Sequence, residues 1–356
     1  MGVILKMHPG EFVKNNDNPI KIKCMKYILG VDGGGSKTHA LIASGDGHIL
    51  GFGKGGSSNH QTCGLHAALK EINHTVAKAL EQAHIALENI HAAAFCLAGA
   101  DFPQDYRILQ ERISQLLPIK QIVIKNDVMA ALKSGLTRPY GVVVVCGTGI
   151  NAGGISKEGR EYVMPGLGRI SGDWGGGVDI SSEMIRVIVR AWDGRGDQTV
   201  LSAMVLDALM VRSIPDLITK IYHKEISFQS ILSIVPLLFE AAEQGDAVAR
   251  RIISAIGEEV GITAKALIRK LDLADSACEV ILAGSIFKGK GTLLIETITH
   301  SINEEFPAME TKRPALEPVM GSLWLALEEM GIQRTTAVLQ NMERTIPAEL
   351  EIKYLN

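Results

Sequence analysis

The chain has 356 residues, of which 37 are glycine and 12 are proline, and 46% are hydrophobic. Collagen is excluded because the glycines follow no Gly-X-Y period, and low-complexity disorder is excluded because this apolar content can form substantial cores. The net charge is −3 and no stretch gathers lysine and arginine into a stripe, so a nucleic acid is not expected as a partner.

The first residues of the chain, 1–26, follow no helix or strand period and lack the apolar region and cleavage site of a secretory signal. We expect them to form a poorly ordered extension. Apolar runs reach about six residues, far fewer than the ~20 that a membrane helix needs. The sequence therefore predicts a cytoplasmic protein without a membrane partner. The five cysteines are widely spaced and are expected to be reduced core thiols: Cys24, Cys63, Cys96, Cys146 and Cys278.

From Tyr27 onward, segments with strand and helix periods alternate. Apolar residues recur at three- and four-residue steps over 65–84, which predicts an amphipathic helix, and Gly45-Asp46-Gly47 is typical of a hairpin turn. The first block therefore has the order βββαβαβα. Its strands are expected at 27–32, 38–44, 48–53, 92–99 and 121–126, and its helices at 65–84, 104–117 and 127–135.

At Gly141 the pattern begins again. A shift of 112 residues places Gly35-Ser36 on Gly147-Thr148 and Gly47 on Gly159, which indicates an internal duplication. Strands are expected at 141–149, 151–156, 160–166 and 279–284, and helices at 179–192, 200–211, 247–271, from 292 and at 318–330. We expect two α/β domains, 27–138 and 139–335, with the site in the cleft between them and a helical segment at 336–356.

The glycine excess is local, since 22 of the 37 glycines lie within 30–56 and 141–177. The first loop runs from Asp32 to Thr38 as DGGGSKT. Its consecutive glycines let backbone N–H groups converge on an anion, and its hydroxyl and lysine side chains add donors and charge. The residues expected to bind phosphate are Gly34, Gly35, Ser36, Lys37 and Thr38, and Asp32 is a candidate ligand for Mg²⁺, directly or through water.

A second glycine loop, Gly147-Thr148-Gly149, again joins two expected strands and ends before Asn151. Two such loops facing each other can clamp a polyphosphate, which favours phosphate binding over the alternative of wide turns that merely need glycine. The first loop does not match a Walker A motif, because Gly35-Ser36-Lys37 lies one residue out of register with Gly30 and is followed by an expected strand and not by a helix. The segments 147–152 and 51–56 match the G-x-G-x-x-G/A fingerprint, but neither is followed by a helix, which disfavours dinucleotide binding. The sequence contains no G-x-S-x-G motif, which excludes the usual nucleophile elbow of hydrolases.

Asp127 follows an expected strand and begins an expected helix. Its carboxylate should project from the carboxyl edge of the sheet, where α/β folds place their ligands. It could cap the helix or accept a hydroxyl proton as that oxygen attacks a γ-phosphoryl group. Its position between the two glycine loops favours catalysis.

Three further residues lie on loops suited to polar ligands. The segment 166–177 precedes a helix whose terminal N–H groups could serve anions or sugar oxygens, and in it Asp173 could bind substrate or cap the helix, while Trp174 could be a core anchor. Asn59 and His60 could bind sugar hydroxyls. The alternatives are an Asx-type cap for Asn59 and a solvated side chain for His60.

Six motifs in this order resemble those of the N-acetylglucosamine kinases in the BadF/BadG/BcrA/BcrD ATPase group of the actin, hexokinase and Hsp70 superfamily. They are DGGGSKT, SSNH, NDVMAA, CGTGIN, GDWG and AGS, within 27–327. The resemblance implies two duplicated ribonuclease-H-like domains around a cleft, as in actin and hexokinase. It also implies a kinase that uses ATP and Mg²⁺ to phosphorylate a sugar hydroxyl, with O6 of N-acetylglucosamine as the expected acceptor.

The resemblance assigns roles residue by residue. Asp127 is similar to the catalytic base, and Gly284-Ser285 to the adenosine loop. The residues expected to contact the sugar are Asn59, His60, Asp127, Asn151 and Asp173.

The chain departs from the family pattern at three positions. Trp174 stands where the family commonly has glutamate, Ile150 where it has serine, and Leu167 where an aromatic is expected. The sequence therefore does not decide which amino sugar is the substrate. The candidates are N-acetylglucosamine, glucosamine, muramic acid and N-acetylmuramic acid.

Two other functions and the oligomeric state are also open. An ATPase that activates a 2-hydroxyacyl-CoA dehydratase-type partner would need paired cysteines for a cluster, and only Cys146 lies near a suitable loop. A nucleotide or sugar sensor without turnover is the third alternative. The sequence also leaves a homodimer open.

Overall fold

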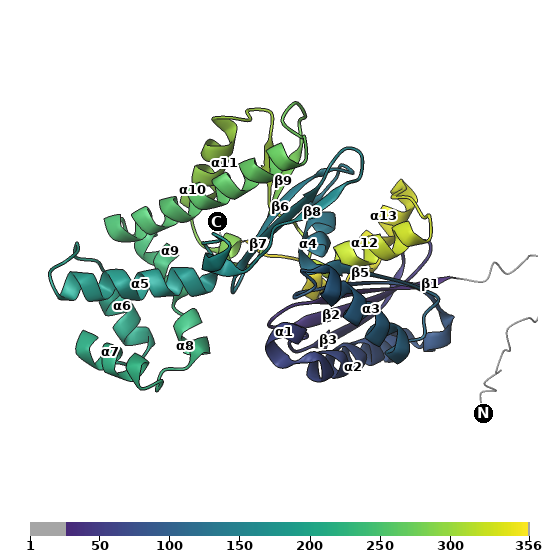
Figure 1. The fold of residues 1–356 in the computed structure, drawn as a ribbon, viewed down its shortest axis with the longest axis horizontal. Coiled ribbons are helices and arrows are strands. Elements are labelled where there is room, and N and C mark those ends of the chain that lie inside the picture. Colours follow the sequence, from purple (N-terminus) through teal and green to yellow (C-terminus); the bar gives the residue numbers. More distant parts are fainter. Residues whose placement is uncertain (1–25, 355–356) are drawn as a thin grey trace, which may run out of the picture.

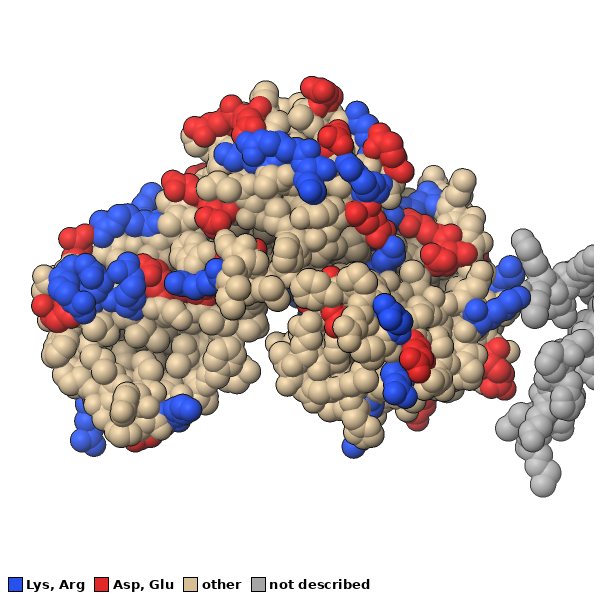
Figure 2. Space-filling model, viewed as in Figure 1, with Lys and Arg blue, Asp and Glu red and all other residues tan. Residues whose placement is uncertain are grey.

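The computed structural model describes residues 26–354 and forms two lobes, each built on a five-stranded sheet (Figure 1). The extension expected at 1–26, apart from Lys26, and Cys24 lie outside the described residues. Acidic and basic side chains are interspersed on the face in Figure 2, which also shows a notch between the lobes. Within 26–354, no helix is both long and apolar enough to cross a membrane.

The sheet of the first lobe has the strand order β3-β2-β1-β4-β5. β1, β4 and β5 are parallel, whereas β2 and β3 continue from β1 as an antiparallel meander. The strands are β1 (Tyr27–Gly33), β2 (Thr38–Ser44), β3 (Ile49–Gly55), β4 (Ile90–Leu97) and β5 (Gln121–Asn126). The helices are α1 (His60–Cys63), α2 (Leu65–Ala83), α3 (Pro103–Leu116) and α4 (Asp127–Gly135), with a 3₁₀ turn η1 (Leu87–Asn89). The expected order βββαβαβα is confirmed.

The sheet of the second lobe has the strand order β10-β9-β6-β7-β8. Read from the β8 edge, this is the same topology as in the first lobe. Its strands are β6 (Gly141–Cys146), β7 (Ile150–Ile155), β8 (Glu161–Val163), β9 (Glu279–Ala283) and β10 (Glu310–Lys312). Again the first strand is central, with an antiparallel meander on one side and parallel strands on the other. Gly47 and Gly159, which the 112-residue shift aligns, both have positive φ in their hairpin turns. The predicted duplication is confirmed.

Helices make up most of the remainder of the second lobe. They are α5 (Gly177–Trp192), α6 (Leu201–Ala208), α7 (Ile214–Tyr222), α8 (Phe228–Leu232), α9 (Val235–Glu243), α10 (Ala247–Lys270) and α11 (Leu293–Asn303), with 3₁₀ turns η2 (Gly168–Ile170) and η3 (Ser285–Lys288). The sequence did not predict α7 to α9 or β10. Each of these elements spans at most nine residues, too few to show a sustained helix or strand period, and α7 and α9 are stabilised by apolar side chains that pack in the lobe's core.

The last helices return to the first lobe. α12 (Val319–Glu329) is buried along nearly its whole length and packs on α4, β1 and β4. The boundary predicted at 335 therefore groups α12 with the wrong sheet. The reason is that an apolar helix shows no preferred face in its sequence, so its packing partner cannot be read from its pattern.

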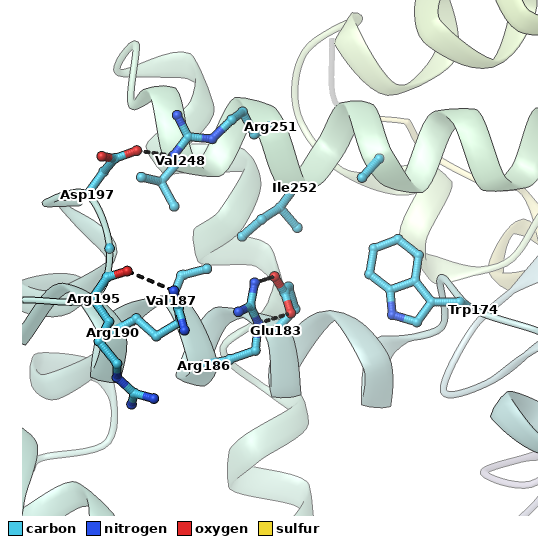
Figure 3. Close-up of a pocket in the computed structure, with 12 residues that line it drawn as sticks. Trp174, Glu183, Arg186, Val187, Arg190, Arg195, Asp197, Val248, Arg251 and Ile252 are labelled. Carbon is cyan, nitrogen blue, oxygen red and sulfur yellow. Dashed lines mark hydrogen bonds and ion pairs between the residues drawn. The ribbon is translucent and has the colours of Figure 1, made fainter. Parts of the chain in front are cut away.

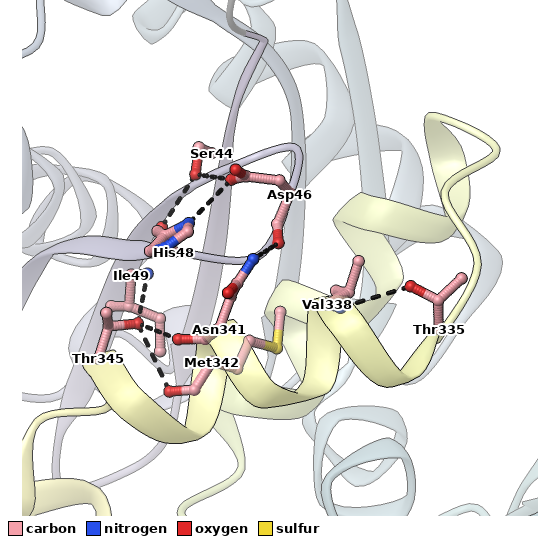
Figure 4. A network of polar contacts seen from close by, with 9 residues as sticks. All are labelled: Ser44, Asp46, His48, Ile49, Thr335, Val338, Asn341, Met342 and Thr345. Atoms are coloured by element: carbon pink, nitrogen blue, oxygen red, sulfur yellow. Dashed lines mark hydrogen bonds and ion pairs between the residues drawn. The ribbon is translucent and has the colours of Figure 1, made fainter.

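The C-terminal helix α13 (Thr336–Thr345), followed by the turn η4 (Ala348–Leu350), fastens the hairpin between β2 and β3 (Figure 4). Asn341 donates to the carbonyl of Asp46 at 2.8 Å, and the Ile49 amide donates to the Thr345 hydroxyl at 2.9 Å. The helical segment predicted at 336–356 is thus anchored on the first lobe.

The cysteines divide by environment. Cys96, Cys146 and Cys278 are buried free thiols, as expected, but Cys63 is exposed because the short helix α1 lies on the surface. Burial raises the pKa of the Cys146 thiol. This environment disfavours the thiolate that a cluster would need.

α4 lies at the junction of the lobes, contacting α12 and both sheets. A Cβ on Gly321 of α12 would lie 1.9 Å from the carbonyl oxygen of Ala130 and 2.9 Å from the amide nitrogen of Ser134, both on α4. Because these are backbone atoms, the helices would have to separate. We expect Gly321→Ala to lower the free energy of unfolding by about 3 kcal/mol in urea titrations.

The matched control for this prediction is Gly56→Ala, where the nearest atom lies 3.7 Å away on the side chain of Glu71. We expect it to change stability by less than about 0.5 kcal/mol. Equal stability of the two variants would contradict the tight packing of α4 on α12.

Candidate active site

The carboxyl ends of β1, β4 and β5 meet at one edge of the first sheet. Asp32 pairs in register with Cys96 of β4, and Leu97 of β4 pairs with Asn126 of β5. Because parallel strands end together, Asp32 and Asp127 project from this same edge. The structure thus brings together two acidic residues that are 95 positions apart in the sequence.

Asp127 is the first residue of α4, but it does not cap the helix. The cap is Asn126, whose side-chain oxygen accepts a hydrogen bond from the Val128 amide at 3.0 Å. Burial, followed by the charge of Asp101, raises the pKa of Asp127 to about 6. Since the cap position is filled by its neighbour, the Asp127 carboxylate is available for chemistry with a pKa close to neutrality.

Asp101, in the loop after β4, is a site residue that the sequence did not predict. Its carboxylate accepts hydrogen bonds from Asn126 Nδ2 at 2.8 Å and from Gln61 Nε2 at 3.1 Å. Asp101 thereby holds the residue that caps α4. No motif marks it, and only the strand register brings it next to Asn126.

Asp32 is 8% exposed at the end of β1. Burial and then the charge of Asp127 raise its pKa to about 8, although Lys37 acts in the opposite direction. A cation at this position would relieve both effects. One or two carboxylates together with phosphate oxygens and water suit Mg²⁺, so the residues fit this ion, although no group of three or more potential metal ligands occurs within 26–354.

The glycine loops at 32–38 and 147–149 are predicted to bind phosphate, and we call them the first and second phosphate loops. Hydrogen bonds of the backbone fix the shape of the first, which joins β1 to β2. The Gly34 amide donates to the Lys37 carbonyl at 2.9 Å, and the Ser58 amide donates to the Gly34 carbonyl at 3.1 Å. Gly35 and Ser36 are exposed, and a Cβ on Gly35 would meet open space. The loop can therefore approach a phosphate closely.

One predicted phosphate contact in this loop does not fit. Thr38 is fully buried, and its hydroxyl donates to the Gly56 carbonyl at 2.7 Å and lies 2.8 Å from the Ser58 hydroxyl. Because it starts strand β2, its side chain points into the lobe. Thr38 fixes the loop and does not face a phosphate.

The second phosphate loop and the predicted adenosine loop lie side by side in the second lobe. Gly284 has φ +109°, and a Cβ there would lie 2.2 Å from the Cys146 carbonyl oxygen, so only glycine allows this approach. A Cβ on Gly147 or Gly149 would meet open space. Gly284 therefore allows the two loops to pack together, whereas Gly147 and Gly149 leave space for a ligand.

A cavity of about 420 Å³ opens beside these loops. We call it the adenosine cavity. Its walls include Gly147, Thr148 and Ser285, apolar side chains of α8, α9 and η3, and Lys288. An apolar slot beside open glycine loops fits a purine base with its phosphates.

The N-terminus of α5 is not free for a ligand, contrary to prediction. The amides of Gly177 and Val178 donate to the carbonyls of Gly147 and Thr148 at 2.8 and 3.0 Å. α5 therefore uses these donors to fix the second phosphate loop.

Asp173 and Asn151 lie in and under the loop that follows β8. Asp173 accepts a hydrogen bond from Ser171, and its amide donates to the Gly168 carbonyl at 3.0 Å. The helix cap of α5 is Gly176, so the alternative of Asp173 as a cap is wrong. A Cβ on Gly166 would lie 3.0 Å from Asn151 Nδ2, which places this amide directly beneath the loop.

Asn59 and His60 lie at the start of α1 in the first lobe. Asn59 caps this short helix by accepting from the Gln61 amide at 2.9 Å, as the alternative interpretation held. The side chain of His60 is 13% exposed, and its Nε2 lies 3.4 Å from Asp105, so the expectation of a solvated histidine is wrong. His60 Nδ1 is buried and has no hydrogen-bond partner in the described chain.

A model of the BadF/BadG/BcrA/BcrD ATPase family matches residues 29–326. The chain belongs to this family. It is 30% identical to an N-acetylmuramic acid/N-acetylglucosamine kinase of Clostridium acetobutylicum, over 86% of this chain and 99% of that protein. It is 28% identical to an N-acetyl-D-glucosamine kinase of Dictyostelium discoideum, over 85% of this chain and 98% of that protein.

A solved ROK family glucokinase of Streptomyces griseus, in complex with glucose and AMPPNP, has the same fold. It aligns with a TM-score of 0.58 and 19% identity, over 85% of this chain and 99% of that chain. The expected two-domain hexokinase-like ATPase fold is thus confirmed.

Two of the three departures expected from the family pattern line cavities of the second lobe. Ile150 lines a cavity of about 810 Å³ with Gly149 and Arg169. Trp174 lines a neighbouring cavity of about 430 Å³ and packs against the core, as the alternative interpretation held (Figure 3). The side chain of Leu167 is half exposed.

The cavity of Figure 3 contains several arginines, but carboxylates neutralise most of them. Arg186 makes two hydrogen bonds of 2.6 Å to Glu183, and Arg251 contacts Asp197 at 2.5 Å. These pairs account for the polar character of this cavity without a ligand.

Proposed function

We propose that this protein is an ATP-dependent sugar kinase that phosphorylates an amino sugar, at O6 of N-acetylglucosamine. The observation that carries the proposal is Asp127, a half-buried carboxylate with a pKa of about 6 at the sheet edge that also holds Asp32 and the first phosphate loop. The kinase activity named for the relatives from Clostridium and Dictyostelium supports the same class of reaction.

ATP would lie with its base in the adenosine cavity and its phosphates against the two glycine loops. The open space at Gly35, Gly147 and Gly149 supports this placement, because a side chain at any of them would fill it. Asp32 would hold Mg²⁺, directly or through water, and the ion would supply charge neutralisation for the phosphates.

In the reaction, the Asp127 carboxylate accepts the proton of the sugar hydroxyl. The hydroxyl oxygen forms a bond to the γ-phosphorus, and the bond between that phosphorus and the β,γ-bridging oxygen breaks. The electron pair of the broken bond leaves with ADP. Asn126, held by Asp101, fixes the helix turn that carries the base. Closure of the lobes would exclude water from this step.

The sugar pocket would be formed by Asn59 and His60 from the first lobe and by Asn151 and Asp173 from the second. Asn59 and His60 lie at the start of α1, which contacts Asp101 through Gln61 and Asp105 through His60. Since Asp101 also contacts Asn126, the neighbour of Asp127, these contacts support a sugar pocket beside the proposed base. N-acetylmuramic acid is the second candidate, because the Clostridium relative is named for it as well.

A coupled assay of ADP release with Mg-ATP tests the proposal. N-acetylglucosamine, glucosamine, muramic acid, N-acetylmuramic acid and glucose are the acceptors to compare. We expect the largest kcat/KM with an N-acetylated amino sugar. Release with glucose alone would overturn the amino-sugar assignment, and release that does not depend on sugar would indicate an ATPase.

The pH dependence of turnover should follow the ionisation of Asp127. Since the base must be ionised to accept a proton, kcat/KM is expected to fall about tenfold per unit as the pH drops below about 6. Asp101→Asn removes a negative charge that raises this pKa, so the decline should move to lower pH. An unchanged profile in that variant would show that Asp101 does not influence the base.

A further inference from the structure

The segment that links the two lobes carries one acidic residue into the nucleotide site. Glu317 lies between β10 of the second lobe and α12, which packs on the first sheet. Its carboxylate lies 2.5 Å from Lys37 Nζ in the first phosphate loop and 3.3 Å from Lys288 Nζ in η3. Glu317 therefore joins lysines from the two lobes.

Each lysine that Glu317 joins belongs to one wall of the proposed nucleotide site. Lys37 is part of the glycine loop beside Asp32, and Lys288 lines the adenosine cavity. Each lysine is roughly two-fifths exposed, whereas the carboxylate side chain is 11% exposed. Burial raises the pKa of Glu317, but the hydrogen bond and charge of Lys37, followed by Lys288, outweigh it and keep the pKa below its usual value. The carboxylate is ionised and holds both cations.

The backbone of this linking segment is fixed by the end of the chain. The Glu317 amide donates to the Leu350 carbonyl at 2.9 Å, and the Ile352 amide donates to the Ala315 carbonyl at 2.8 Å. The Tyr354 hydroxyl donates to the Pro314 carbonyl at 2.6 Å. These contacts come from residues beyond 326, where the family match ends. Glu317 thus has a rigid support, as a positioning residue requires.

We propose that Glu317 is a positioning residue for phosphoryl transfer, which holds Lys37 and Lys288 at the phosphates while lowering the net positive charge of the site. The proposal rests on the kinase function proposed above. A carboxylate beside the phosphates opposes ground-state binding of ATP, so its presence is useful only if the geometry it imposes on the lysines matters in the transition state.

Glu317→Gln is expected to bind the nucleotide more tightly and yet to turn over more slowly. The amide removes the charge but keeps the shape. We expect kcat to fall about tenfold because the lysines lose their fixed position. The Kd of a non-hydrolysable ATP analogue should decrease about threefold, because one negative charge has been removed beside the phosphates. A purely structural role would weaken both.

The matched control is Glu328→Gln, which removes the same charge from the end of α12, where Glu328 pairs with Lys133 at 2.9 Å. We expect kcat and the Kd of the ATP analogue to stay within twofold of the wild-type values in this control. Glu317→Asp keeps the charge and should recover part of kcat. If Glu317→Gln does not fold, Lys288→Met provides the second test, with the same fall in kcat but weaker binding of the analogue.

The outcomes separate this proposal from the kinase function. If Glu317→Gln matches Glu328→Gln in both kcat and Kd, or if it loses binding and turnover in proportion, the positioning role is wrong. If the wild type phosphorylates no sugar, the proposed function is wrong. In that case the Kd of the analogue still tests the charge effect of Glu317, because binding is measured without an acceptor.

Discussion

Asp127→Asn is expected to lower kcat about 10³-fold while the Kd of the sugar changes less than threefold. The amide has nearly the same shape as the carboxylate but cannot accept the proton of the attacking hydroxyl. The fold should tolerate the change, since Asn126 caps α4 and Asp127 does not. Steady-state kinetics and calorimetric titration of the sugar measure the two quantities separately.

The control for this variant is Glu111→Gln, because Glu111 is an exposed residue of α3 in the first lobe and contacts no proposed site residue. It removes the same charge from the first lobe and should retain most of the turnover. Turnover of Asp127→Asn within tenfold of wild type would show that another group accepts the proton.

Asp32→Asn is expected to abolish at least 99% of turnover and yet to stabilise the protein when nucleotide and metal are absent. In the folded protein the pKa of Asp32 is about 8, against 3.8 for the free side chain. Between these values the folded state holds a proton that the unfolded state has released, so the stability of the wild type falls as the pH rises from about 4 to about 8. The variant has no carboxyl group at this position, so its stability should not fall for this reason over the same pH range. Linkage between these two pKa values predicts an unfolding free energy about 5 kcal/mol above that of the wild type at pH 8.

Urea titrations at pH 5 and pH 8 measure this difference, which should be larger at pH 8. Asp46→Asn is the control, because hydrogen bonding from Ser44 keeps the pKa of Asp46 below its usual value. It should give no gain in stability. A wild type more stable than Asp32→Asn at pH 8 would show that Asp32 is paired with a cation in the folded protein. Addition of Mg²⁺ should stabilise the wild type more than the variant.

Much of the fold follows from local patterns in the sequence. Runs such as 141–146 are apolar at every position, and hairpin glycines such as Gly47 and Gly159 mark the turns, so strands and their duplication could be predicted. The glycine loops and Asp127 were predicted for the same reason, because each directly follows a strand. The roles of these site residues remain predictions that the variants above test.

Side-chain partners could not be predicted in the same way. The Thr38 hydroxyl was expected to face a phosphate, but it is buried against Gly56 and Ser58 because strand alternation turns it inward. A solvated side chain was the alternative interpretation of His60, but the ring lies beside Asp105, 45 residues away. A single sequence does not record which distant side chain fills the space next to a residue.

The sequence by itself determined the two-domain α/β plan and the strand-end positions of Asp32, Asp127 and the glycine loops, because periodicity and turn chemistry act over a few neighbouring residues. Only the tertiary structure decided that α12 packs on the first sheet and that Glu317 meets Lys37, 280 residues away. It also decided that Asp32 is buried and lies close enough to Asp127 for the charge of Asp127 to raise the pKa of Asp32. Burial and charge interactions depend on distances in space, which arise only when the two lobes are assembled.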